Sequence, residues 1–121
     1  MNDNDAANKK FQKELISGTA SLILLSILDR TSKPMYGYQI ARLMDSGKRD
    51  VPIKQGALYP VLRSLEGSGL LQSEVEPSVS GPPRRYYRIT QDGRRAVRQW
   101  REIWGETRAF VDSILKGAYD E

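Results

Sequence analysis

One segment, residues 55–93, constrains the fold of this chain more than any other. It opens with apolar residues whose spacings of four and three place them on one helical face: Leu58, Leu62 and Leu65. Other side chains point elsewhere: Gln55, Tyr59, Arg63 and Ser64. Gly67 and Gly69 should end the helix, because glycine adopts the left-handed conformation of a terminating turn at little cost. The segment therefore begins with a helix that packs on one face and leaves another free.

A β-hairpin is expected next, with residues 70–75 and 84–89 as its strands. The intervening residues 77–83 include three prolines and a glycine, which favour a turn over regular structure. We call the whole hairpin, residues 70–89, the wing. Thr90 is the expected N-cap of another helix, in which Asp92 lies near the positive end of the helix dipole. A helix, a hairpin and a further helix in this order are typical of a winged helix.

Two helices are expected before this segment. Residues 9–30 have a helical pattern that is apolar nearly all round in its second half, so this helix should be central, with Gly18 as an interruption that leaves an N-terminal arm. Residues 36–45 form the next helix. Its expected inward side chains are Ile40, Leu43 and Met44. A loop over residues 46–52 leads to the third helix, and residues 1–8 are polar and expected to be disordered.

Pro60 breaks a local rule inside the third helix. Proline deletes a backbone hydrogen bond and normally kinks or breaks a helix, at a cost of about 3 kcal/mol or more. If the helix starts as late as Ala57, Pro60 lies in the first turn and the cost largely vanishes. The pattern therefore predicts the helix but leaves its first residue open.

Composition bounds the class of protein. With 121 residues the chain holds one domain, and its 39% hydrophobic and 28% charged residues are those of a folded globular protein. It has no Cys and no His, which excludes disulfides and the usual zinc sites. The longest apolar run, Leu22 to Leu25, is far shorter than a membrane span, and the N-terminus lacks the apolar core of a signal peptide. We expect a cytoplasmic protein with no membrane segment.

No pattern in the chain is typical of a catalytic centre. There is no nucleophile elbow, and Gly67-Ser68-Gly69 is too short for a dinucleotide fingerprint. The carboxylates are scattered among basic residues on helices, as on ordinary solvated surface. We therefore expect neither catalytic residues nor a cofactor.

Positive charge is concentrated in one part of the chain. The whole chain carries a net charge of +4, but residues 84–101 alone contain seven arginines and one acid, a net charge of +6. Residues 102–121 carry a net charge of −3. A basic segment that coincides with the wing is the electrostatic footprint of a surface that faces phosphates. The alternative is that these arginines are ordinary solvated surface.

The last helix, expected over residues 92–118, carries a heptad pattern. Apolar residues repeat along it at alternating spacings of three and four, and others widen the same stripe. The expected dimerisation residues are Val97, Trp100, Ile103, Trp104, Thr107, Phe110, Val111 and Ile114. A module whose core is already filled cannot cover this stripe, so we expect a second copy of the chain to cover it in a two-fold homodimer.

Four ordered motifs resemble the PadR family of bacterial transcriptional regulators. They are residues 36–40, residues 55–66, residues 69–71, and residues 83–90 with Gly93 after them. The resemblance covers residues 22–93, and the single C-terminal helix is similar to the compact branch of the family, which includes multidrug-sensing repressors. It implies a winged helix-turn-helix at residues 9–90, a dimerisation helix at residues 91–121, and double-stranded operator DNA as the partner.

The groove-facing side chains of the third helix are Gln55, Tyr59, Arg63 and Ser64, because Gln and Arg can present paired hydrogen bonds to base edges. Further expected DNA contacts are Tyr36, Tyr38, Gln39 and Lys54 before that helix, and Arg84 and Arg85 on the wing. Two alternatives stay open, because Tyr59 and Tyr38 can each belong to the core. Tyr86 and Tyr87 alternate across a strand, so one of them should be buried.

Trp100 and Trp104 lie four residues apart and share a helix face. They either fill the dimer interface or line a site for a small effector. In the multidrug-sensing members that this chain resembles, a tryptophan on this helix stacks flat aromatic compounds across the dimer, and Trp104 aligns best with it. These observations predict a repressor that binds a pseudo-palindromic operator and is released by an effector, with a protein-interaction module as the alternative.

Overall fold

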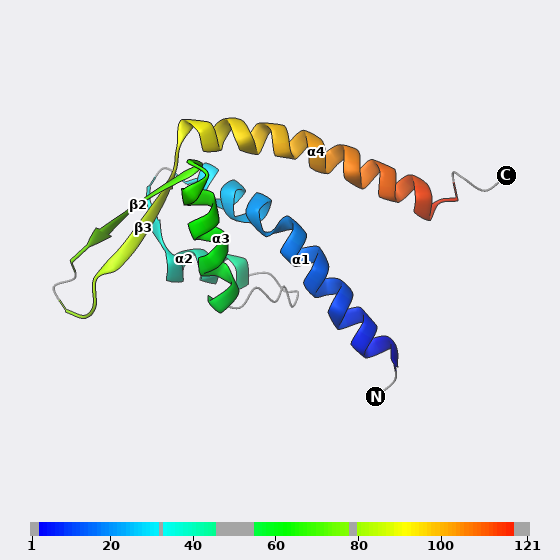
Figure 1. The fold of residues 1–121 in the computed structure, drawn as a ribbon, viewed down its shortest axis with the longest axis horizontal. Coiled ribbons are helices and arrows are strands. Elements are labelled where there is room, and N and C mark those ends of the chain that lie inside the picture. The colour runs from blue at the N-terminus through cyan, green and yellow to red at the C-terminus, as the bar shows by residue number, and fades with distance from the viewer. Residues whose placement is uncertain (1–2, 32, 46–54, 78–79, 118–121) are drawn as a thin grey trace.

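The computed structural model describes residues 3–31, 33–45, 55–77 and 80–117. Over these ranges it has four helices and three short strands. They run in the order α1 (Asp3–Asp29), β1 (Met35–Tyr36), α2 (Gly37–Asp45), α3 (Gln55–Gly67), β2 (Leu71–Glu76), β3 (Arg84–Ile89) and α4 (Gln91–Leu115). Figure 1 shows α2, α3 and the strands gathered at one end of the molecule, from which α1 and α4 extend as two long helices. The expected architecture, mainly α with a small hairpin, is confirmed.

The core lies where the second half of α1 meets α3, α2 and the sheet. Its fully buried side chains come from every one of these elements and from the start of α4: Leu24, Leu25, Leu28, Ile40, Leu58, Leu62, Leu71 and Val97. Each buried Leu or Ile contributes roughly 1.5 to 3 kcal/mol relative to an exposed one. Leu58, Leu62 and Leu65 are all buried, as their spacing predicts.

The sheet has three antiparallel strands in the order β1-β3-β2. In the wing, Leu71 pairs with Ile89 and Glu76 pairs with Arg84. The predicted second strand is confirmed, and the first is displaced by one residue. The sequence missed β1, because a strand of two residues carries no alternation; Met35 and Tyr36 pair with β3 where the pattern predicts the start of a helix.

The first half of α1 differs from the prediction. It runs without a break from Asp3 to Asp29, so the expected disorder of residues 1–8 is wrong for residues 3–8, and Gly18 does not interrupt the helix. An interior glycine costs only about 1 kcal/mol, which a helix this long tolerates. Residues 4–29 are also long and apolar enough to cross a membrane by length and composition alone. Leu24 and Leu28 lie in the core, so we interpret the second half of α1 as part of a core helix, while residues 4–15 are exposed.

Two further expectations, on Leu43 and on the end of α4, are corrected, and the first residue of α3, which the pattern left open, is observed. Leu43, predicted to point inward, is 48% exposed, because α2 buries only the stripe of Ile40 and Met44. The helix α3 starts at Gln55 and holds Pro60 in its interior, where one of its first hydrogen bonds is missing and the helix continues. The helix α4 ends at Leu115, since Gly117 has a φ of +80°, the conformation that terminates helices. The expected loop over residues 46–52 lies outside the described residues.

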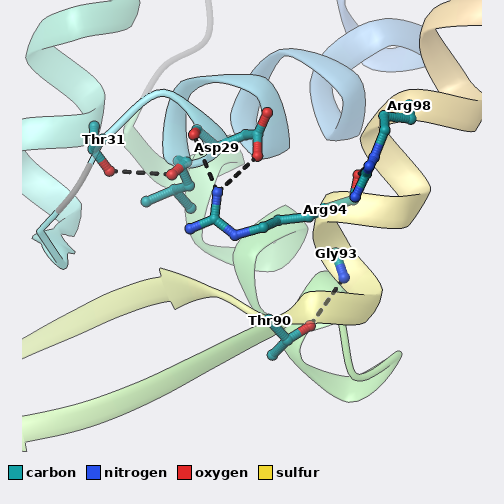
Figure 2. Close-up of polar contacts among 7 residues, drawn as sticks. Asp29, Thr31, Thr90, Gly93, Arg94 and Arg98 are labelled. Atoms are coloured by element: carbon teal, nitrogen blue, oxygen red, sulfur yellow. Dashed lines mark hydrogen bonds and ion pairs between the residues drawn. The ribbon is translucent and has the colours of Figure 1, made fainter.

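The start of α4 is tied to the turn between α3 and β2. Thr90 is the predicted N-cap: its Oγ1 accepts a hydrogen bond from the Gly93 N–H at 3.0 Å (Figure 2). The same Oγ1 donates a hydrogen bond to the Gly69 carbonyl at 2.7 Å. The Thr90 N–H donates to the Leu70 carbonyl at 3.1 Å. A Cβ on Gly93 would overlap that carbonyl oxygen and Ile89. The close approach of the two backbones therefore requires glycine at position 93.

A second link joins α4 to the end of α1. The Arg94 guanidinium donates to the Asp29 carboxylate at 3.1 Å and to the Asp29 carbonyl at 3.5 Å (Figure 2). Beyond this link the two helices diverge toward their far ends, as the two arms of a V do (Figure 1). The closed end of the V lies on the winged-helix module.

We predict that Gly93→Ala destabilises the fold by about 1 to 3 kcal/mol, because the new methyl group forces the α4 and Leu70 backbones apart. Gly105→Ala is the matched control, since a Cβ there meets no atom within 4 Å. That change should be neutral or should stabilise by up to about 1 kcal/mol through helix propensity. Urea titrations of both variants at one protein concentration measure the difference, and equal midpoints would contradict the proposed close approach.

Candidate nucleic-acid interface

The helix α3 presents a polar face beside the wing. Arg63 and Ser64 are exposed, and Arg63 forms no ion pair with any residue that the structure describes. Leu62 and Leu65, next to them in the chain, are buried in the core. The predicted division of the helix into a packed face and a free face is therefore confirmed. The Gln55 side chain and all of Lys54 lie outside the residues whose surroundings are described.

Tyr59 was expected either to face the DNA groove or to belong to the core, and its side chain is partly exposed and partly packed. It is 37% exposed, and its ring lies on Gly37, the first residue of α2. A Cβ added to Gly37 would come within 2.8 Å of Tyr59 Cε1 and 2.9 Å of the hydroxyl oxygen. Gly37 thus allows α2 to approach α3 closely, and the Tyr59 ring packs where the two helices meet.

The start of α2 brings several predicted residues together. Tyr38 is 52% exposed, so its core alternative is wrong. Tyr36 is half-buried, with Tyr86 against it in an edge-to-face contact at 5.6 Å between ring centroids. The Gln39 Oε1 accepts a hydrogen bond from the Tyr36 N–H at 3.1 Å. This bond satisfies a backbone donor just before the helix, a structural role for Gln39 that the sequence analysis missed.

On the wing, Arg85 belongs to a chain of hydrogen bonds. Its Nη1 donates to the Ser73 hydroxyl at 2.9 Å, and that hydroxyl donates to the Glu66 carboxylate at 2.5 Å. Because Glu66 lies in the last turns of α3, this chain joins both wing strands to the C-terminal end of that helix. Arg85 is exposed and is also anchored, and its contact with DNA stays a prediction.

Ion pairs with acidic residues elsewhere in the chain reduce the net positive charge of the basic segment, residues 84–101. Arg94 and Arg88 pair with Asp29 and Glu74, which lie outside residues 84–101, and Arg95 pairs with Asp92. Exposed pairs of this kind contribute only about 0 to 1 kcal/mol to stability, but they cancel charge locally. The count of +6 therefore overstates the charge that this segment offers to a polyanion.

Behind this surface, Tyr87 is buried and Tyr86 only half-buried, so the expected burial of one of the pair is confirmed. Burial raises the pKa of the Tyr87 hydroxyl above its ordinary value of 10.0. The positive charges of Arg85 and Arg63 lower this pKa, and Glu66 and Tyr59 raise it further. Burial therefore favours the neutral form of this hydroxyl.

The model of the Transcriptional regulator PadR-like family matches residues 24–99. The chain belongs to this family. The matched range runs from the buried part of α1 through the whole winged-helix module into α4, so the family's DNA-binding fold and the geometry described above coincide.

Solved structures of similar transcriptional regulators agree. The chain is 34% identical to a PadR family transcriptional regulator from Eggerthella lenta, with a TM-score of 0.81 over 93% of this chain and 95% of that one. A transcriptional regulator from Clostridium thermocellum is 30% identical, with a TM-score of 0.70 over 83% and 93% of the two chains. The chain is also 26% identical to "Uncharacterized protein X" from Lysinibacillus sphaericus, over 88% of this chain and 96% of the relative.

The α4 helix of this PadR protein carries the predicted apolar stripe, with one correction. Val97 is fully buried in the chain's own core and is not available to a partner, and Trp100 is half-buried against that core. The remaining predicted interface residues are exposed: Ile103, Trp104, Thr107, Phe110, Val111 and Ile114. The stripe therefore begins one turn later than the heptad pattern predicts, because the first turns of α4 complete the core.

Both tryptophans line a groove between α1 and α4. The groove has a volume of about 610 Å³ and a mostly apolar wall. Leu15 and Leu22 of α1 face Trp100, Ile103 and Trp104 of α4 across it. Trp104 is 39% exposed, so its indole is accessible from the groove.

We predict that the stability of the protein falls at alkaline pH partly through Tyr87. Because the pKa of this hydroxyl is higher in the folded than in the unfolded chain, its contribution is fully present below about pH 10 and is lost as pH rises through the folded value. The free energy of unfolding should therefore fall less steeply above about pH 10 in Tyr87→Phe than in the wild type. Urea titrations from about pH 8 to about pH 11 measure both slopes, and identical slopes would refute this assignment.

Proposed function

We propose that this PadR-family regulator is a homodimeric repressor that binds a pseudo-palindromic DNA operator and is released by a small planar aromatic effector. The observation that carries the DNA part is the free polar face of α3, with exposed Arg63, beside a wing that is hydrogen-bonded to the same helix through Ser73 and Glu66. A helix of this kind enters the major groove while the wing lies along the backbone. A DNA-binding regulator acts where the DNA is, so we place it in the cytoplasm.

The exposed apolar stripe of α4 supports the dimer. Ile103, Phe110 and Ile114 are 58%, 57% and 45% exposed, and Phe11 and Leu15 of α1 are 62% and 46% exposed. Apolar surface on this scale marks an interface, and a second copy in two-fold symmetry covers the same stripe on both chains. The two copies of α3, which act as recognition helices, then meet successive major grooves, about 34 to 36 Å apart. A strictly monomeric protein in analytical ultracentrifugation would contradict this assembly.

The first experiment is a fluorescence-anisotropy titration against the protein's own promoter and a scrambled duplex at two salt concentrations. Tight binding that prefers the promoter and weakens with salt is the expected result. Absence of binding at low salt would overturn the repressor proposal and favour a protein-interaction module.

Within that assay, Arg63→Ala should reduce the preference for the promoter over the scrambled duplex by about 1 to 3 kcal/mol, the value of one good base contact. Arg108→Ala on α4 is the matched control, because it removes the same charge from a residue far along the helix from the module. The control should keep the full preference. An unchanged preference in Arg63→Ala would remove this residue from the base-reading set.

The groove between α1 and α4 supports the effector part of the proposal. A flat aromatic compound in this groove contacts the exposed Trp104 indole and separates α1 from α4. Such a compound releases DNA only as far as its affinity differs between the two arrangements of the dimer. An identical operator affinity with and without the compound would leave a repressor that has no inducer.

We predict that proflavine, a planar aromatic cation, quenches the tryptophan fluorescence of the protein. Trp104→Leu should weaken its binding at least about tenfold, or about 1.4 kcal/mol, while Trp100 remains as the reporter. Trp100→Phe is the comparison variant, because it keeps the exposed indole of Trp104. If Trp104→Leu binds the dye as tightly as the wild type does, the two indoles only pack the dimer.

A further inference from the structure

We propose that Arg42 and Arg84, each held over a tyrosine ring, bind the phosphate backbone of one DNA strand on the α2 side of the wing. The proposal rests on the proposed DNA-binding function and adds Arg42, which no sequence motif singled out. We call the four residues Arg42, Tyr38, Tyr36 and Arg84 the arginine–tyrosine stack.

The stack is continuous from one guanidinium to the other. Arg84 Cζ lies 4.7 Å from the centroid of the Tyr36 ring. The Tyr36 and Tyr38 rings are stacked, with 6.2 Å between centroids and 17° between their planes. Arg42 Cζ lies 6.0 Å from the centroid of the Tyr38 ring. Each ring of the stacked pair therefore has one guanidinium within the distance at which cation–π attraction acts.

Three elements fix this arrangement. Tyr36 pairs with Tyr86 in the sheet, which brings β1 beside β3 and hence Tyr36 beside Arg84. Tyr38 and Arg42 are one turn apart on α2, so they share a helix face. The arginines are thus held in place before any partner arrives, which reduces the side-chain entropy lost on binding.

The stack also lies next to the recognition helix. Gly37, between the two stacked tyrosines, is the residue on which the Tyr59 ring of α3 packs. A duplex that receives α3 in its major groove therefore brings a backbone close to the stack. About two turns further along the same helix, Glu66 is joined to the wing through Ser73.

The two arginines of the stack differ from Arg88, Arg94 and Arg95 in the ion pairs that the structure describes. Neither Arg42 nor Arg84 forms an ion pair among the described residues, whereas Arg88, Arg94 and Arg95 all do. Both stack arginines are exposed. A guanidinium carries five N–H donors in a planar fork that matches phosphate geometry, so a tyrosine at its face leaves donors for a phosphate. These contacts position the protein on DNA and do not read the base sequence.

The test is the salt dependence of DNA binding by Arg42→Ala. The slope of log K against log salt should fall by about one unit, equally for the promoter and the scrambled duplex, because one phosphate contact is lost. Arg108→Ala, which removes the same charge far from the stack, should keep the wild-type slope. Thermal unfolding of Arg42→Ala should match the wild type, since the side chain is exposed.

A double-mutant cycle tests the role of the ring. Tyr38→Leu should weaken binding, and its effect should be much smaller in the Arg42→Ala background, because both changes disturb the same contact. If Arg42→Ala binds DNA as tightly as the wild type does, with an unchanged salt slope, the proposed phosphate contact of the stack is wrong. The proposed repressor function is then unaffected. Failure of the wild type to bind any duplex at low salt would overturn both, so the two failures are distinguishable.

Discussion

The close approach of Gly93 to the Leu70 carbonyl is the contact on which the placement of the other elements depends. It allows the first turn of α4 to lie directly on the turn between α3 and β2, where Thr90 bonds to both sides. The wing leaves this joint in one direction and α4 in the other. Arg94 then fixes α4 to the end of α1 through Asp29. The surface proposed to face DNA and the helices with the apolar stripe are therefore held together as one framework, although few residues join them.

Much of this framework was predictable because it depends on local rules. The leucine spacing of α3, the prolines and glycine of the wing tip and the Thr90 cap each determine an element within a few residues of themselves. The strand β1 was not predictable, since it exists only because β3 offers it a partner. The helical state of residues 3–8 was also missed. Adding a residue to an existing helix costs little, so polar residues can extend a helix that apolar residues have nucleated further along.

The candidate site shows the same division between local and distant causes. Sequence patterns placed Arg63, Arg84 and Tyr38 on a surface, and they are exposed there. Patterns could not show which arginines keep their charge, because the partners of Arg88 and Arg94 come from other elements. Likewise, only the folded chain stacks the tyrosines that hold Arg42 and Arg84. The charge of a binding surface is thus decided by tertiary contacts as much as by composition.

The V formed by α1 and α4 has a mechanical consequence. With 25 residues, α4 is about 37 Å long, and it is attached to the winged-helix module at one end only. It therefore acts as a lever whose pivot is the joint at Thr90 and Gly93. A tilt of about 5° at the pivot corresponds to a displacement of about 3 Å at the far end of α4. In the proposed dimer, a wedge no thicker than an aromatic ring, inserted between the arms, is geometrically sufficient to change the separation of the two modules.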